Sequence, residues 1–490
     1  MSESLKQKSV KGMAWTGLER LVTQVLQFVV GIVIARVLMP EDYGVIGMLA
    51  IFIAIAQSFL DSGFANALIQ KKDRTNVDYC TVFYFNIVSS LVLYLILFFA
   101  APYIASFYKM PILTPVARVV SLSLIVNGLT IVQTAKLSID LNFKVQSLAT
   151  IVSTAISGFI GIYMAYSGFG VWALVAQSLS AAALRSIMLW ACSKWRPSMI
   201  FSKASFNQLF SFGSKLLASG LINTIYQNMY TLVIGKFFLP ADVGFFNRGK
   251  HFAQLPAETT KQVLLKVNFP VLSQFQNDDE KLVYAYQKLL RTPMFLLCPL
   301  MLGLAAIAGP LIEVLLGTKW MPCVSILQIL CLGYLWVPLT HVNLNLLNVK
   351  GRSDLVLKLE LIKKPIAFLI LFASIPFGIW WMCLGRAFYS FFAFVVNCYY
   401  TNKIMDYGLI KQLKMLMPIF IYSTIMFALM YLTSSLDVNV YWKLIVGIVV
   451  GVLSYLLMAI ALKDESLQDL CDILLKKFQK KRMSSFDRRV

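Results

Sequence analysis

The sequence predicts an all-α polytopic membrane protein with about 14 transmembrane helices. We expect two six-helix bundles, related by an axis along the membrane normal, and two further helices at the C-terminal end. The prediction rests on composition, charge asymmetry and an internal repeat. The chain has 490 residues, of which 59% are hydrophobic and 14% are charged, whereas soluble chains carry about 25% charged residues. One helical crossing needs roughly 20 apolar residues, so about 12 to 15 crossings fit and no soluble domain does.

Apolar runs place the spans along the chain. The N-terminal segment carries Lys6, Lys8 and Lys11 but no uninterrupted apolar run that ends in a small-residue cleavage site, so we expect no removable signal peptide. The fourteen predicted spans are 14–38, 43–69, 79–108, 112–135, 146–167, 171–192, 206–237, 243–270, 293–317, 322–348, 355–376, 380–402, 415–433 and 441–462.

Basic residues alternate between the connections of these spans. The chain has 44 Lys and Arg against 23 Asp and Glu, a formal net charge of +21. If the N-terminus is cytoplasmic, 28 basic residues fall on the cytoplasmic side and only Lys109 and Lys319 on the other. Since cytoplasmic connections are enriched in Lys and Arg, both termini are predicted to be cytoplasmic. The basic tail 463–490 then follows the same rule and lies at the membrane surface, so we expect no nucleic-acid partner.

Two stretches of the sequence repeat each other. Residues 33–45, VIARVLMPEDYGV, and residues 233–245, VIGKFFLPADVGF, share Val, Ile, Pro, Asp and Gly at an offset of 200. Phe169–Trp172 resembles Phe377–Trp380 at an offset of 208, as Pro102 resembles Pro310. Each repeat has six spans, an even number, which predicts parallel repeats with a substrate site between them. The predicted domains are 1–200, 201–410, helices 13 and 14 in 411–462, and the tail 463–490.

Metal and cofactor chemistry is not expected. The eight cysteines are scattered without a CxxC pair, and seven of them lie in or beside apolar runs, so we interpret them as core residues. The only histidines are His251 and His341. The chain is therefore predicted to have no catalytic site, metal or cofactor and not to be an enzyme.

Basic residues exceed acidic ones deep inside the predicted spans. A charge at the centre of a membrane helix costs about 2.5–3.5 kcal/mol on insertion scales, so such residues normally face a bundle interior or a wet cavity. The deep acids are Glu19, Asp61 and Glu258, candidates for coupling or for ion pairs. For Arg185 we favour a side chain that reaches back to the membrane surface. The deep bases assigned to a substrate-binding cationic cavity are Arg20, Arg118, Lys215, Arg248, Lys250, Lys261 and Arg386.

Polar residues also share helix faces in the first two spans of each repeat. Thr16, Arg20, Thr23 and Gln27 recur at helical spacing on the first span, and Gln57 precedes Asp61 by one turn on the second. Matching depths further predict that Arg20 pairs with Asp61. The seventh span carries Lys215, Ser219, Asn223, Tyr226 and Tyr230, and the eighth carries Asn247, His251, Gln254, Glu258 and Lys261. An alternative is that the eighth span is an interfacial amphipathic helix.

Three segments resemble one known family. The N-terminal KGMAWTGLERLVTQVLQFVVGIVIARVLMPEDYGVIGMLAIFIAIAQSFLDSGFANALIQKKDR, the central LFSFGSKLLASGLINTIYQNMYTLVIGKFF and the later LNLLNVKGRSDL are similar to Wzx-type polysaccharide flippases, particularly the colanic-acid-exporter branch. That family belongs to the MOP superfamily, together with MATE drug exporters and lipid II flippases. The resemblance covers about residues 5–410 and carries no universal catalytic motif.

The resemblance implies a function. It implies alternating access of a central cationic cavity, which turns undecaprenyl-pyrophosphate-linked oligosaccharide units from the cytoplasmic to the periplasmic leaflet of the bacterial inner membrane. The implied partners are that cargo, membrane lipids and other polysaccharide-assembly proteins. A MATE-like exporter of cationic drugs is an alternative, although its cavity should be negatively charged. An integral-membrane enzyme of glycan assembly is another, although it should carry a larger extramembrane loop or domain.

Overall fold

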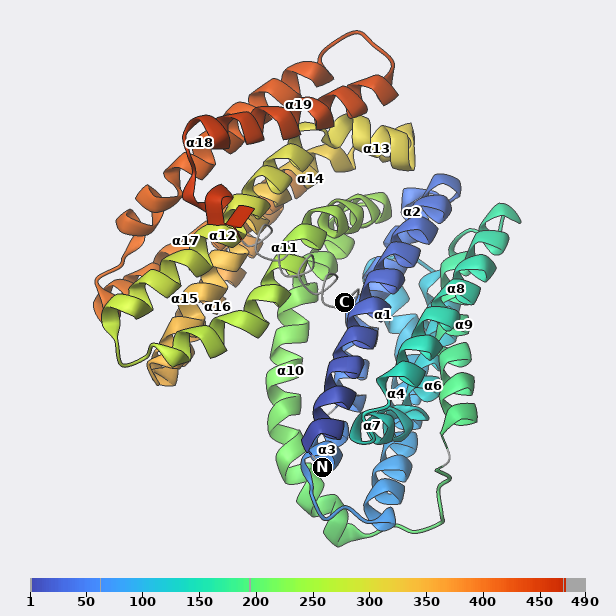
Figure 1. Ribbon diagram of the computed structural model, residues 1–490. Helices are drawn as coiled ribbons and strands as arrows, with labels where there is room; N and C mark the ends of the chain where they lie inside the picture. Colours follow the sequence, from blue (N-terminus) through green and yellow to red (C-terminus); the bar gives the residue numbers. More distant parts are fainter. Residues whose placement is uncertain (1, 62, 194, 470, 473–490) are drawn as a thin grey trace, which may run out of the picture. The chain divides into compact units, whose positions relative to one another are not determined.

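The computed structural model describes residues 2–61, 63–193, 195–469, 471 and 472. All regular secondary structure in these residues is helical, in long helices joined by short connections (Figure 1). Eleven helical segments within the described residues are long and apolar enough to cross a membrane. The prediction of an all-α polytopic membrane protein is therefore confirmed.

The chain divides into two compact units, Met1–Asn247 and Arg248–Val490. The first contains the six spans of the first repeat and also α10, which packs along α2. The predicted domain boundary at 200/201 follows the repeat and stays a prediction. The helices of the first unit are α1 Ser2–Val37, α2 Pro40–Leu60, α3 Phe64–Gln70, α4 Asn76–Tyr108, α5 Leu113–Val120, α6 Leu122–Gly128, α7 Ile131–Ile139, α8 Phe143–Tyr166, α9 Val171–Cys192 and α10 Lys203–Phe237.

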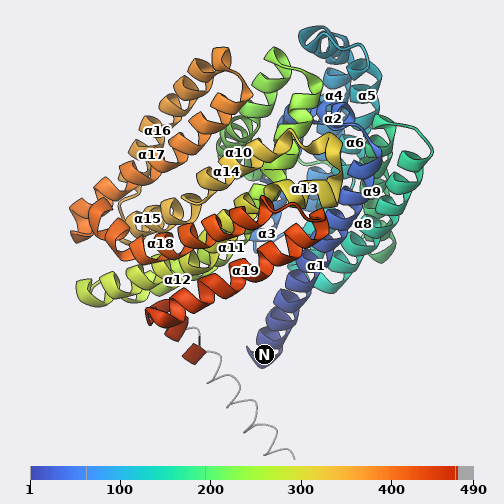
Figure 2. The ribbon, with the colours of Figure 1, turned by 90° about the horizontal axis from the view of Figure 1, so that it is seen from above.

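Helix α11, Pro240–Gln274, begins in the first unit and continues into the second. Near the end of the second unit, α18 and α19 run side by side (Figure 2). The segments of this unit after α11 are α12 Asp279–Ala306, α13 Ala308–Leu316, η1 Thr318–Trp320, α14 Cys323–Tyr334, α15 Val337–Val349, α16 Ser353–Ser374, η2 Ile375–Phe377, α17 Ile379–Met405, α18 Leu409–Ser434 and α19 Val440–Ala461.

Each predicted span corresponds to one helix or to a broken series of helices. The span 112–135 is divided among α5, α6 and α7, and the span 322–348 between α14 and α15. The predicted spans 206–237, 243–270 and 355–376 are the helices α10, α11 and α16, which are long enough to cross but are not among the eleven apolar segments. These are the spans in which the sequence concentrates charge.

The repeat has a structural counterpart. Pro40 and Pro240 each stand at the first position of a helix, where a proline lacks only an N–H that would have no helical partner. The backbone N–H of Met39 donates to Asp42 Oδ2 at 3.0 Å, and that of Leu239 donates to Asp242 Oδ2 at 3.1 Å. The helix order also repeats, because the helices α1–α9 correspond to the first six predicted spans and the helices α10–α17 correspond to the next six.

Small residues allow close helix packing in the first unit. Helix α8 packs against both α1 and α9. Val30 and Ile34 of α1 meet α8 at Gly158 and Gly161, where an added Cβ would lie 2.7 and 3.0 Å from these two side chains. Small residues at helix interfaces let backbones approach and gain van der Waals contact, which is the main attraction between helices in lipid.

Candidate functional site

Three of the predicted cations of the second unit are linked pairwise with neighbouring polar side chains. We call Lys250, Glu258, Lys261, Tyr334 and Arg386 the second-half cluster. The three helices α11, α14 and α17 supply these residues. Lys250 and Arg386 are within electrostatic reach of each other, as are Glu258 and Tyr334. The structure therefore brings together three of the predicted cavity cations and one of the predicted deep acids.

Tyr334 positions the guanidinium of Arg386. Arg386 Nη2 donates to the Tyr334 hydroxyl at 3.1 Å, and its guanidinium carbon lies 5.6 Å from the centre of the Tyr334 ring. Helices α14 and α17 pack against each other, which holds the two side chains in register. Arg386 thus combines a hydrogen bond with a cation–π contact.

Glu258 and Lys261 form an ion pair on α11. Lys261 Nζ lies 3.2 Å from both carboxylate oxygens of Glu258, one helical turn away. The Lys261 side chain is 23% exposed and the Glu258 side chain is 31% exposed. The pair lowers the cost of carrying either charge inside the membrane and keeps both groups accessible.

Arg248 belongs to the same helix and lies near its contact with α14. Its guanidinium carbon is 6.0 Å from the centre of the Trp320 ring. One residue later, Gly249 packs on α14, since an added Cβ would lie 3.0 Å from Ile326 Cγ2 and 3.3 Å from the Cys323 carbonyl oxygen. The glycine therefore lets α11 pack closely on α14 beside Arg248.

The predicted ion pair between Arg20 and Asp61 is wrong. No ion pair joins them among the described residues; Asp61 accepts a hydrogen bond from Gln57 Nε2 at 3.1 Å and is within electrostatic reach of Arg185. Arg20 and Asp61 were paired because they have equal depth in the membrane, but depth does not determine which helices are neighbours. Helix α1 packs on α8, whereas α2 packs on α9 and α10. Arg185 lies on α9, which packs against α2.

The other predicted groups of the first unit contact their own bundle. Glu19 Oε2 accepts a hydrogen bond from Ser147 Oγ on α8 at 2.7 Å. Arg118 Nε donates to the Phe98 carbonyl oxygen at 3.3 Å, and its guanidinium carbon lies 4.2 Å from the Phe98 ring centre. These contacts attach α1 to α8 and α5 to α4. Arg20 itself is exposed on α1.

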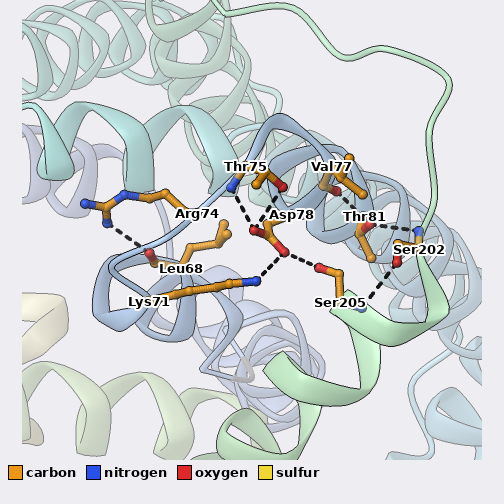
Figure 3. A network of polar contacts seen from close by, with 9 residues as sticks. All are labelled: Leu68, Lys71, Arg74, Thr75, Val77, Asp78, Thr81, Ser202 and Ser205. Carbon is orange, nitrogen blue, oxygen red and sulfur yellow. Dashed lines mark hydrogen bonds and ion pairs between the residues drawn. The ribbon is translucent and has the colours of Figure 1, made fainter.

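Lys215 lies on α10, and its side chain is outside the described residues, as is that of Ser219. The start of α10 is nevertheless well defined. Figure 3 shows Asp78, at the start of α4, between Lys71 and Ser205. Lys71 Nζ is 2.8 Å from Asp78 Oδ1, and the Ser205 hydroxyl donates to the same oxygen. Asp78 is 2% exposed, so α10 begins at a buried, paired carboxylate.

The connection before α10 is fixed to the same place. The Ser202 N–H donates to Thr81 Oγ1 at 3.1 Å (Figure 3), and Trp195 Nε1 donates to Asn76 Oδ1 at 2.8 Å. We call Lys71, Asp78, Thr81, Ser202 and Ser205 the α4–α10 anchor. It attaches the first helix of the second repeat to the first unit.

Sequence reasoning missed several polar residues of the second unit. Glu360 pairs with Lys363 at 2.7 Å and with Lys364 at 3.6 Å, and none of the three was among the predicted site residues. The spacing of Glu360 from these lysines, three and four residues, was a usable signal of ion pairing. Tyr334 carried no such signal, because an aromatic residue in an apolar run is indistinguishable from core.

Relatives of the chain are named for polysaccharide biosynthesis. The teichuronic acid biosynthesis protein TuaB of Bacillus subtilis is 24% identical over 470 residues, 93% of this chain and 96% of the relative. The lipopolysaccharide biosynthesis protein WzxC of Escherichia coli is 25% identical over 368 residues, 74% of each chain. The succinoglycan biosynthesis transport protein ExoT of Rhizobium meliloti is 26% identical over 334 residues, 68% of each chain.

Solved structures with the same fold include a lipid II flippase, MurJ, in an inward closed conformation. It matches with a TM-score of 0.72 at 15% identity and covers 93% of this chain and 99% of its own. An inward-facing MATE transporter of the MOP superfamily matches with a TM-score of 0.62 at 14% identity, over 81% of this chain and 98% of its own. Residues 33–325, more than half of the chain, match the family described as polysaccharide biosynthesis protein. The chain is thus a multi-pass integral membrane protein with the MOP fold, and it belongs to the polysaccharide biosynthesis protein family.

Proposed function

We propose that the protein is a flippase for polyprenyl-linked oligosaccharides. It moves undecaprenyl-pyrophosphate-linked repeat units from the cytoplasmic to the periplasmic leaflet of a bacterial inner membrane, by alternating access through a cationic cavity. Family membership, the names of the relatives and the fold support a role in transport for polysaccharide biosynthesis. We further propose the identity of the cargo, the cationic cavity and a connection to other assembly proteins.

One observation carries the choice of an anionic cargo. In the second-half cluster three cations stand with one carboxylate, and Lys250 and Arg386 are like charges within electrostatic reach. Like charges inside a membrane repel each other at low dielectric constant, so an anion that binds between them relieves this repulsion. A net-positive cluster also disfavours the cationic drugs that a MATE-like exporter would carry.

A pyrophosphate head group matches these side chains. Arginine recognises phosphate oxygens through two parallel N–H bonds, and lysine does so as a point charge. Tyrosine, asparagine and glutamine on the same helices suit sugar hydroxyls. The polyprenyl tail stays in lipid during such a transfer, so the protein has to shelter only the polar head.

Export in cells tests the proposal. A strain that lacks its own flippase should regain its surface glycan when it produces this protein. We expect Lys215→Glu and Arg248→Glu each to abolish that export, because each puts a carboxylate in the path of an anionic head group. Lys215→Arg and Arg248→Lys should retain much of it. Glycan on the cell surface is measured beside the amount of membrane-inserted protein, because loss of a structural ion pair would mimic loss of function.

Lys72→Glu is the matched control. It makes the same charge change at an exposed residue in the connection between α3 and α4, outside the spans, and should export normally. Full export by a stably inserted Lys215→Glu, Arg248→Glu double variant would rule out the cationic-cavity mechanism.

A further inference from the structure

We propose that the connection between α9 and α10 binds an anionic phospholipid of the cytoplasmic leaflet. In this site, Arg196 and Lys203 hold the phosphodiester head group, and Met199, Ile200 and Phe201 contact the acyl chains. We call these five residues the connection site. All five belong to the first unit, and the proposal does not depend on the cargo proposed above.

The connection, residues 193–202, is attached to the start of α4 on both sides of its apolar residues (Figure 1). Before them, Trp195 is 6% exposed in the core of the first unit, and the Ser198 N–H donates to Cys80 Sγ at 3.3 Å. After them, the Ser202 N–H donates into the α4–α10 anchor. Packing on the bundle therefore fixes the path of the three residues between Ser198 and Ser202.

These three residues are large, apolar and exposed. Met199 is 97% exposed, Ile200 is 44% exposed and Phe201 is 56% exposed. The Phe201 ring contacts that of Phe206 on α10, with the ring centres 6.3 Å apart, but remains more than half uncovered. Three consecutive apolar side chains are unfavourable in water. Because the connection is held on both sides, these side chains lose that cost by entering lipid.

Aromatic and basic side chains mark the membrane surface beside the connection. Tyr79, near the start of α4, and Trp190, near the end of α9, are both partly exposed. Lys136 Nζ lies 5.7 Å from the centre of the Tyr79 ring, and the Arg196 guanidinium carbon lies 5.5 Å from the centre of the Trp190 ring. Tyrosine and tryptophan gather at the head-group level of a membrane. This places the connection among the head groups, next to the start of the acyl chains.

The Arg196 side chain is arranged to receive a phosphate. Its Nη1 donates to the carbonyl oxygens of Ser193 at 2.6 Å and of Trp195 at 2.9 Å. These bonds fix the plane of the guanidinium and involve one of its three nitrogens. The N–H groups of Nε and Nη2 then point in the fork geometry with which arginine binds two phosphate oxygens.

Charge selects an anionic lipid over a zwitterionic one. Residues 193–203 contain no Asp or Glu, and Lys203, the first residue of α10, is exposed. The carboxylate of the adjoining anchor, Asp78, is 2% exposed and already paired with Lys71. Each Lys or Arg near a membrane surface strengthens its attraction to anionic lipid by roughly fivefold. A phosphatidylglycerol head group, which carries a net negative charge, should therefore be preferred.

Quenching by brominated lipids measures this preference at the site. Full-length protein with Met199→Cys carries a fluorophore on that cysteine, in a background where the exposed Cys192 and Cys471 are replaced by serine. It is reconstituted in vesicles of phosphatidylcholine and phosphatidylglycerol, one of which has brominated acyl chains that quench on contact. We expect brominated phosphatidylglycerol to bind beside the fluorophore at least about fivefold better than brominated phosphatidylcholine.

Ile445→Cys, labelled in the same way, is the matched control. Ile445 is 51% exposed on α19, inside a membrane span, so both brominated lipids should quench it equally. Arg196→Gln and Lys203→Gln should each lower the preference at residue 199 several-fold, and together they should abolish it. Unchanged quenching at residue 445 shows that these variants are correctly inserted.

Three results would overturn the proposal. Absence of quenching at residue 199 would put the connection in water, and equal quenching by both lipids would show contact without an anionic site. A preference that persists when Arg196 and Lys203 are both neutralised would assign it to other residues.

The polar head of the proposed cargo has related chemistry, so unbrominated undecaprenyl pyrophosphate is added as a competitor. If it restores the fluorescence at a far lower mole fraction than unbrominated phosphatidylglycerol does, the site binds cargo and the phospholipid proposal is wrong. Export is not part of this measurement, so a failure of the proposed transport function leaves its result intact.

Discussion

Gly44 and Gly244 occupy equivalent places in the two repeats, and neither leaves room for a side chain. A Cβ on Gly44 would collide with the carbonyl oxygen of Pro240, and a Cβ on Gly244 would collide with that of Pro40. The contact is reciprocal, as expected where two copies of one motif face each other. All four residues lie in the first unit.

We predict that Gly44→Ala destabilises the protein by about 1–3 kcal/mol, the usual cost of forcing atoms into a packed interface. The backbone of Pro240 has to move, which also perturbs the start of α11. Thermal unfolding of the detergent-purified variant measures the change.

Gly17→Ala provides the matched control. Gly17 is exposed on α1 and has nothing within 4 Å of an added Cβ, so alanine should stabilise the helix by roughly 0.5–1 kcal/mol. Equal melting temperatures for Gly44→Ala and Gly17→Ala would show that the reciprocal contact does not constrain the fold.

Sequence reasoning found the charged residues but not all of their partners. Helical spacing placed Glu258 and Lys261 on one face of α11, and the structure pairs them. The neighbours of Asp61 depend on which helices pack on α2, and hydropathy has no information about helix neighbours. The contact of Arg386 with Tyr334 was equally inaccessible, because it joins residues 52 positions apart.

At the scale of elements, the breaks in the fourth and tenth spans could not be predicted. Hydropathy describes 112–135 and 322–348 as continuous apolar runs. In the first run, however, one helix ends before Ser121 and the next ends at Gly128. In the second run, the helix is interrupted at Leu335 and Trp336. Helix breaks inside apolar runs are supported by tertiary contacts. At Leu129, for example, the freed carbonyl oxygen accepts a hydrogen bond from Trp190 Nε1 of α9 at 3.1 Å.

The α4–α10 anchor was missed because its one lysine, Lys71, was used only to predict topology. We predict that Asp78→Asn costs about 1.5–3 kcal/mol, since it removes the charge of a buried carboxylate that accepts hydrogen bonds from Lys71 and Ser205. The N-terminal part of α10 should then become accessible to protease. Limited proteolysis of membranes and thermal unfolding of the purified variant measure these effects.

Asp354→Asn is the control for this prediction. Asp354 pairs with Arg352 at 2.9 Å, but both are exposed at the surface, so no measurable change in stability is expected. An Asp78→Asn variant as stable and as resistant to protease as Asp354→Asn would show that the anchor does not hold α10.

At the scale of the whole molecule, contacts within each unit agree with the predicted alternation of sides. In the first unit, Lys236 Nζ donates to the Phe107 carbonyl oxygen at 2.7 Å, which joins two connections predicted to be periplasmic. In the second, Lys350 pairs with Asp279 at 2.8 Å, and Arg291 pairs with Asp464 at 2.9 Å; these three connections are all predicted to be cytoplasmic. Helices α18 and α19 thus return the chain to the side from which they started.

The charge asymmetry also predicts the absolute orientation in the membrane. We predict that both termini lie in the cytoplasm. Of the predicted tail, residues 470 and 473–490 lie outside the described residues, so the test uses positions nearer the helices. Single cysteines are introduced by Lys109→Cys and Lys72→Cys in a background where the exposed Cys192 and Cys471 are replaced by serine. A membrane-impermeant maleimide added to intact cells should label the first variant and spare the second until the membrane is permeabilised.

With 28 basic residues on one side and 2 on the other, the reverse orientation would have to carry nearly all of them across the membrane. Labelling of Lys72→Cys in intact cells, with Lys109→Cys protected, would invert the topology and with it the direction of export.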